Sequence, residues 1–137
     1  MDEALYKSLI SAWRKLPETT RYHLASEDQV SRFESEFEPI PTEYRQFLIQ
    51  FGGGAIGTVW VDGIEELSES HRKFRSEFGP PRGWSMANVF IIGWDGAGNP
   101  FGIHHSSGKI LVEDHNFGGI HAMAESFEDF LAKGILR

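Results

Sequence analysis

The segment that most constrains the fold is residues 40–54, an apolar repeat that ends on three consecutive glycines. Its apolar side chains recur at intervals of three and four residues, which places them on one face of an α-helix: Tyr44, Phe47, Leu48 and Phe51. Pro41 suits the first helical turn, because the N–H that proline lacks would have no partner there. Gly52 can adopt the positive φ that commonly ends a helix. The sequence therefore predicts a helix over residues 41–51 that stops at Gly52.

The same glycines imitate a nucleotide-binding motif. Residues 52–57 match the pattern Gly-x-Gly-x-x-Gly, but that motif needs a strand before the glycines and a helix N-terminus after them. Here a helix comes first, and residues 58–61 are predicted to form a strand. The glycines therefore meet a helix C-terminus, whose partial negative charge repels phosphate. We interpret them as a helix stop and a tight reversal.

Composition limits the class of protein. A chain of 137 residues with 40% apolar residues fits one globular domain over residues 1–137. It has no cysteine, which excludes disulfides and suits a reducing cytoplasm. No secretory signal or membrane-length apolar run is visible. The net charge of −7 argues against nucleic acid as a direct ligand and suits a basic partner. We expect a cytoplasmic protein that binds neither nucleic acid nor membranes.

The order of the predicted elements indicates the fold class. Helices are predicted around residues 5–16, 27–37, 41–51, 65–78 and 127–133, and strands around 56–61, 88–94, 101–105 and 109–115. The run at 88–94 has no polar alternation, so we expect a central strand covered on both faces. Ser26 with Gln29 and Ser126 with Asp129 predict capping boxes at the starts of the second and the last helix, and Gly134 is expected to end the last helix. Helices first, an antiparallel meander next and one closing helix predict an α+β fold. We expect a mainly antiparallel sheet with helices packed on one face.

Three motifs in this order resemble the SUKH superfamily. They are Ile-Pro-x-x-Tyr-x-x-Phe-Leu with the glycine triple at 40–54, Ile-Gly-Trp-Asp-Gly-Ala-Gly-Asn at 92–99, and Ser-Phe-x-x-Phe-Leu at 126–131. The resemblance implies an α+β fold. It also implies kinship with a yeast cell-wall-assembly regulator and with many bacterial immunity proteins, which bind secreted toxins, often nucleases. The motif residues look structural, so the resemblance supplies no catalytic residue.

Histidines near the C-terminus offer a possible metal site. His104, His105, Asp114, His115 and His121 lie within one short region, and imidazole with carboxylate suits zinc or a similar ion. Adjacent residues of a strand point to opposite faces, however, so each neighbouring pair can contribute one ligand at most. We therefore predict no bound metal, with ordinary hydrogen-bonded or surface histidines as the interpretation.

Other catalytic patterns are weak. Ser106 and Ser107 follow His105 on a predicted hairpin tip, where neighbours do not form a nucleophile and base held by a third group. The stretch 95–99 lacks the alternating acids of a calcium loop, and Asp95 and Asn99 are expected to bond the local backbone. We predict a protein that is not an enzyme and uses no cofactor.

Acidic clustering is the more useful pattern for function. Two acidic runs flank the glycine turn, and the candidate contact residues within them are Glu34, Glu36, Glu38, Asp62, Glu65, Glu66 and Glu69. If the fold joins the runs, they form one negative surface; the alternative is two solvated faces. Nearby bases at 72, 73 and 75 can neutralise part of it. Trp84, in a Pro/Gly loop, can anchor an interface.

These patterns leave three hypotheses of function. The first is an immunity protein that binds and neutralises a cognate bacterial toxin by stoichiometric occlusion. A basic nuclease is the expected toxin, and the immunity protein is expected to be a monomer or weak dimer. The second is an intracellular regulatory scaffold related to the cell-wall assembly regulators. The third is a small-ligand or metal-binding protein.

Overall fold

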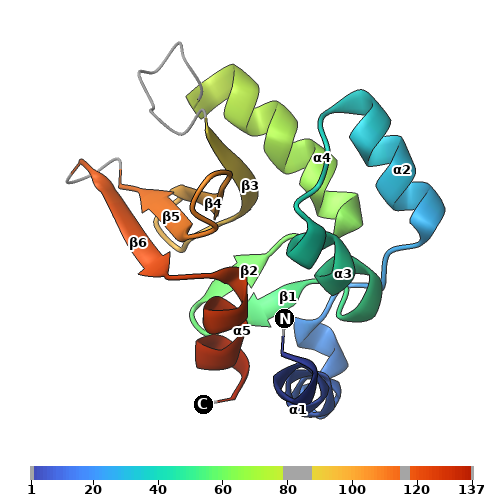
Figure 1. The fold of residues 1–137 in the computed structure, drawn as a ribbon. Coiled ribbons are helices and arrows are strands. Elements are labelled where there is room, and N and C mark those ends of the chain that lie inside the picture. The colour runs from blue at the N-terminus through green and yellow to red at the C-terminus, as the bar shows by residue number, and fades with distance from the viewer. Residues whose placement is uncertain (1, 79–87, 115–117, 137) are drawn as a thin grey trace.

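The computed structural model describes residues 2–78, 88–114 and 118–136 (Figure 1). Its helical elements are α1 (Glu3–Arg14), the 3-10 helix η1 (Glu18–Thr20), α2 (Glu27–Glu36), α3 (Thr42–Gln50), α4 (Ile64–Lys73), the π-helical turn η2 (Phe74–Phe78) and α5 (Phe127–Ile135). Its strands are β1 (Gly54–Ile56), β2 (Val59–Val61), β3 (Val89–Trp94), β4 (Pro100–His104), β5 (Ile110–Glu113) and β6 (Ile120–Ala124). The predicted α+β class is confirmed.

Side-chain caps explain where several helices begin. Ser26 Oγ accepts a hydrogen bond from the Gln29 N–H at 3.1 Å, and Gln29 Oε1 accepts one from the Ser26 N–H at 3.0 Å. These two bonds satisfy backbone donors that have no partner inside α2. Ser126 Oγ caps α5 by accepting from the Asp129 N–H at 3.0 Å, whereas the Asp129 carboxylate accepts from the Glu125 N–H at 3.2 Å. The capping box predicted for α2 is confirmed, and of the one predicted for α5 the Ser126 cap alone is present.

The glycine triple joins α3 to the sheet and also admits the N-terminal segment. Gly52 has φ 92°, which confirms the predicted helix stop. A Cβ at Gly52 would lie 2.5 Å from the Tyr22 carbonyl oxygen, and one at Gly54 would lie 2.2 Å from the Thr20 carbonyl oxygen. The Tyr22 N–H donates to the Gly53 carbonyl at 2.9 Å. The glycines therefore allow two backbone segments to approach more closely than any side chain permits.

The six strands form one antiparallel sheet in the order β1-β2-β3-β4-β5-β6. As predicted, β3 is an inner strand, and most of its side chains are buried. One predicted strand was wrong, and one strand was missed. The single strand expected at 56–61 is a hairpin, because Gly57 with φ 62° turns the chain between β1 and β2. The edge strand β6 had no predicted counterpart, since most of its side chains are exposed and lack alternation.

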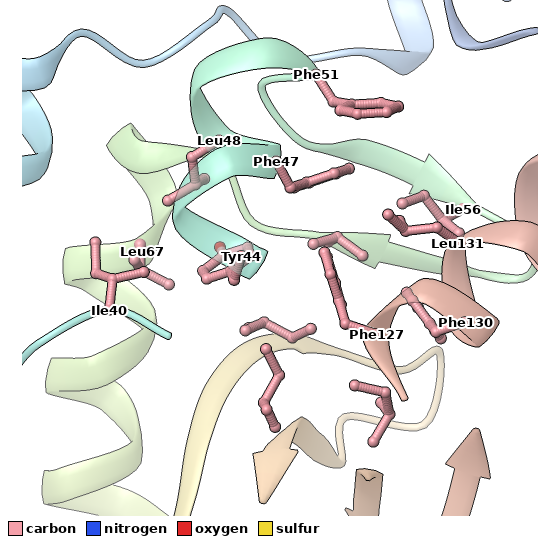
Figure 2. Close-up of a cluster of buried hydrophobic side chains, with 14 of the residues drawn as sticks. Ile40, Tyr44, Phe47, Leu48, Phe51, Ile56, Leu67, Phe127, Phe130 and Leu131 are labelled. Carbon is pink, nitrogen blue, oxygen red and sulfur yellow. The ribbon is translucent and has the colours of Figure 1, made fainter. Parts of the chain in front are cut away.

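The main core lies between one face of the sheet and the helices. Figure 2 shows the rings of Tyr44 and Phe47, from α3, beside that of Phe127, from α5. The Phe47 and Phe127 rings meet edge to face with centroids 5.3 Å apart, and the Tyr44 ring lies 5.9 Å from Phe127. Phe90, from β3, lies 5.9 Å from Tyr44. Each of these rings stabilises the fold by about 1.5–3 kcal/mol through burial.

The helix predicted over 65–78 changes character along its length. Leu67 and His71 are buried. The α-helical part ends at Lys73, and the chain continues as the π-helical turn η2 to Phe78. The loop expected at 79–83 lies outside the described residues.

Gly134 does not end α5, contrary to the prediction. The helix continues to Ile135, and a Cβ at Gly134 would lie 2.3 Å from Ile56 Cγ2 on β1. The glycine therefore serves close packing of α5 against the hairpin. Sequence periodicity describes one helix alone and cannot distinguish this role from that of a helix stop.

Candidate partner-binding surface

The fold brings the two predicted acidic runs onto neighbouring helices. Glu34 and Glu36 lie on α2, Glu38 lies just after it, and the second run begins α4. Helices α2 and α4 lie side by side, as Figure 1 shows. An ion pair of 2.9 Å joins Glu36 on α2 to Arg72 on α4. The two runs are therefore neighbours, although basic residues lie between them.

The α2 run is largely engaged in local contacts. Glu34 Oε2 accepts a hydrogen bond from the Ile40 N–H at 2.8 Å. Glu36 pairs with Arg72, and Glu38 Oε1 lies 3.6 Å from His105 Nε2. These carboxylates order the segment between α2 and α3, so they contribute less free negative charge than their number suggests.

Basic side chains cover the end of α2, as expected for residues 72–75. The guanidinium carbons of Arg72 and Arg75 lie 5.5 Å and 4.9 Å from the centroid of the Phe37 ring. A cation over an aromatic face is attracted by the ring quadrupole. This end of the helix pair is consequently mixed in charge.

The α4 run presents more free charge. Glu65 and Glu69 are exposed, and neither carboxylate has an ion pair or hydrogen bond among the described residues. Glu66 is half-buried, and its Oε1 accepts the Gly63 N–H at 3.1 Å, which caps the helix start. We call these three residues the α4 acidic surface. It is the part of the predicted surface that can attract a basic partner at long range.

Asp62 does not belong to that surface. The prediction treated it as an exposed acid, but only 8% of the residue is exposed. Ser70 Oγ donates to its carboxylate and accepts from Trp94 Nε1–H at 2.9 Å, while Tyr44 donates to the Asp62 carbonyl at 2.6 Å. Burial raises the pKa of Asp62 to about 7, the Ser70 bond opposes the rise and Glu66 adds to it. The carboxyl is an interior group that ties α4 to β2 and β3.

Trp60 is an exposed aromatic residue that the sequence interpretation missed. Its strand neighbours Val59 and Val61 are buried, whereas 44% of Trp60 is exposed. Its ring lies 5.8 Å from that of Tyr22. A usable signal was present in the sequence: in a Val-Trp-Val strand one side chain must face away from the core. The other candidate anchor, Trp84, lies outside the described residues.

A hollow between α1 and the segment after η1 has no catalytic arrangement. It measures about 370 Å³, and its lining includes Arg14, Glu18, Arg21 and His23. It contains no serine nucleophile and a single carboxylate. The described residues of this hollow therefore supply neither a nucleophile paired with a base nor two carboxylates across a cleft.

A comparison with models of protein families identifies the family of this chain. Residues 24–133 match the model of the SMI1 / KNR4 family (SUKH-1). The chain belongs to this family. The three motifs at 40–54, 92–99 and 126–131 all fall inside the match, so the resemblance is confirmed. A search of curated proteins finds no match to the chain.

The surface residues of this SUKH-1 protein lie partly inside and partly outside the matched range. Trp60 and the α4 acidic surface lie inside the matched range, whereas Tyr22 lies before it. In the described part of the chain, no helix has both the length and the apolar character that a bilayer crossing requires.

Among the described residues of this SUKH-1 protein, His104, His105 and His121 do not converge. His104 Nδ1 is hydrogen-bonded to Ser107 Oγ at 2.7 Å, His105 faces Glu38, and His121 is exposed on β6. His115 lies outside the described residues. No group of three potential metal ligands occurs within the described ranges. That the protein needs no metal stays a prediction.

The predicted turn after β3 has the expected hydrogen bonds. Asp95 Oδ1 accepts from the Ala97 and Asn99 N–H groups, both at 2.9 Å, and Asn99 Nδ2–H donates to Asp95 Oδ2 at 3.1 Å. The motif residues of this turn therefore act structurally, as the family resemblance implied.

Proposed function

We propose that this protein is an immunity protein that neutralises a cognate basic toxin by binding it stoichiometrically. Its SUKH-1 membership supports the class of function, and its net charge of −7 supports a basic partner. The observation that carries the proposal is the α4 acidic surface, where Glu65 and Glu69 are exposed and their carboxylates have no partner among the described residues. The toxin expected from the family resemblance is a nuclease, and occlusion of its active site would stop it.

Electrostatics assign this surface a kinetic role. Exposed charges act over about 8 Å at physiological ionic strength, so they steer encounter more than they hold the finished complex. The association rate of the complex should fall steeply as salt is added. Its dissociation rate should depend mainly on buried contacts at the centre of the interface.

The test needs a candidate toxin, which is sought among the products of the genes beside this one. Inhibition should be complete at one equivalent of the immunity protein. The double variant Glu65→Lys/Glu69→Lys should associate at least about tenfold more slowly, because steering accelerates association by about tenfold or more. Charge reversal at Glu34 and Glu66 is less informative, because the Glu34 carboxylate accepts the Ile40 N–H and the Glu66 carboxylate caps α4.

A matched control separates the surface from net charge. The double variant Glu3→Lys/Glu18→Lys changes the net charge equally at exposed residues of α1 and η1. It should associate almost as fast as the unaltered protein. No inhibition at any ratio would reject the immunity proposal. A regulatory scaffold, the other hypothesis, would instead bind without abolishing an activity of its partner.

A further inference from the structure

Trp60 is an aromatic side chain that the fold holds out toward solvent. It is 44% exposed, whereas every other aromatic residue within 2–76, 88–114 and 118–136 is half-buried or buried. The exposure is built into the fold, because Val59 and Val61 point into the core from the same short strand. The strand therefore requires Trp60 to face outward and fixes its direction.

Tyr22 makes the exposed tryptophan part of a larger aromatic face. The Tyr22 and Trp60 rings lie 5.8 Å apart and are tilted by 53°. Tyr22 is held by its N–H bond to the Gly53 carbonyl. Trp60 also pairs directly with Trp94 across β2 and β3, so both indoles lie on one face of the sheet. We call Tyr22, Trp60 and Trp94 the aromatic face.

One end of the aromatic face already receives a cation from the protein itself. Lys73 Nζ lies 4.7 Å from the centroid of the Trp94 ring. Tryptophan is the side chain whose ring face attracts cations best. Trp60, between Trp94 and Tyr22, carries the same kind of ring and is 44% exposed to solvent.

Negative charge lies beside the Tyr22 end of the aromatic face. A Cβ at Gly63 would lie 2.8 Å from Glu66 Oε1 and 3.0 Å from Tyr22 Cβ, so the Glu66 carboxylate lies close to Tyr22. Burial first, and the charges of Glu66 and Asp62 next, raise the pKa of the Tyr22 phenol. An aromatic ring and a carboxylate together match an ammonium or guanidinium group.

We infer that Trp60, Tyr22 and Glu66 form a docking site for a lysine or arginine side chain of a basic protein partner. The cation lies on the Trp60 ring, and Glu66 balances its charge. That the partner is a toxin rests on the proposed function, whereas the cation site does not. The aromatic pair supplies the central contact of the interface, and Glu65 and Glu69 form its charged rim.

The site is testable without the toxin. A hexa-arginine peptide is titrated into ¹⁵N-labelled protein, and the four tryptophan indole N–H signals are followed by NMR. The Trp60 indole and the Tyr22 and Gly63 amides should shift and saturate together. Trp60→Ala should lower the affinity for the peptide by about two- to fivefold, the range for an exposed cation–π contact. A hexa-glutamate peptide should leave these signals unmoved.

Two further variants separate the site from general attraction. Glu66→Gln keeps an acceptor for the Gly63 N–H but removes the charge, so it should also weaken the peptide. Ile120→Ala is the matched control, because Ile120 on β6 is equally exposed at 44%, and it should bind normally. Circular dichroism and thermal melting establish that each variant is folded. If Trp60→Ala does not fold, the cation site is judged from the peptide affinity of Glu66→Gln and from the shift of the Trp60 indole signal in the unaltered protein.

Failure of this inference is distinguishable from failure of the immunity proposal. Peptide shifts confined to Glu65 and Glu69 would overturn the cation site. Equal toxin affinity for the unaltered protein and folded Trp60→Ala would overturn it as well, and would leave the immunity proposal intact. A Trp60 shift with the peptide but no toxin binding at all would support the cation site and reject the toxin. The cation site and the immunity proposal are both supported if Trp60→Ala loses toxin affinity by about tenfold or more.

Discussion

Replacing Asp62 with asparagine should reveal a pH dependence of stability that the unaltered protein conceals. Burial raises the pKa of Asp62 from 3.8 to about 7 in the folded state. Between these values the folded protein holds a proton that the unfolded chain has lost. The free energy of unfolding therefore falls as pH rises through this window, by up to about 1.4 kcal/mol per pH unit.

His71 acts in the opposite direction. Its Nε2–H donates to the Ile91 carbonyl at 2.8 Å beneath α4. Burial lowers its pKa from 6.5 to about 4, the Ile91 bond opposes the change and Arg75 adds to it. Between about pH 4 and pH 6.5 the unfolded chain carries a proton that the folded protein lacks. The free energy of unfolding therefore rises with pH, by up to about 1.4 kcal/mol per pH unit.

The two slopes cancel between about pH 4 and pH 6.5. Above that window only the Asp62 slope remains, up to about pH 7. Asp62→Asn removes one slope, so its stability relative to the unaltered protein should increase by about 2.7 kcal/mol between about pH 4.5 and about pH 6.5. His71→Phe should show a relative change of similar size and opposite sign.

Urea unfolding followed by tryptophan fluorescence measures these differences. Groups common to both proteins cancel in the comparison, and the amide oxygen of the introduced asparagine can still accept the Ser70 hydrogen bond. Asp28→Asn, at an exposed carboxylate paired with Arg32, is the control for removal of one surface charge. Parallel stability curves for Asp62→Asn and the unaltered protein would refute the reasoning.

Three further predictions concern glycine packing and metal. Gly52→Ala should destabilise the fold by more than Gly98→Ala, which should cost about 1 kcal/mol. Both glycines have positive φ, but only at Gly52 would a Cβ strike backbone; equal urea midpoints would contradict this. Gly134→Ala should lower the melting temperature although alanine favours helices by about 1 kcal/mol, because its Cβ would meet Ile56; a raised melting temperature would show that α5 shifts freely. Chelator treatment should leave the melting temperature unchanged, and one equivalent of zinc by elemental analysis would contradict the absence of a metal.

Local patterns predicted what local interactions determine. The α3 face, the Gly52 stop and the Ser26 cap depend on residues within a few positions of one another, and all three are confirmed. The class α+β followed from the order of such segments. Family membership was reachable as well, since the three motifs retain their order in the sequence.

Features set by distant partners were not predictable in the same manner. Asp62 looked like an exposed acid, because its burial depends on Ser70, Trp94 and Tyr44 from three other elements. Strand β6 exists through its pairing with β5, since its own side chains are mostly exposed. The neutralising role of Arg72 was expected, but the contact of Glu38 with His105 was not, because His105 is distant from α2 in sequence.

The N-terminal segment has a structural reason to be part of the proposed surface. The family match begins at residue 24. The backbone of residues 20–23 nevertheless packs against Gly52 and Gly54 so closely that a Cβ at either glycine would clash with it. That backbone completes the sheet edge through the bridge between Arg21 and Gly54. Once the segment is held there, Tyr22 necessarily lies against Trp60. The glycines that end α3 therefore also determine which aromatic residue stands beside the exposed tryptophan.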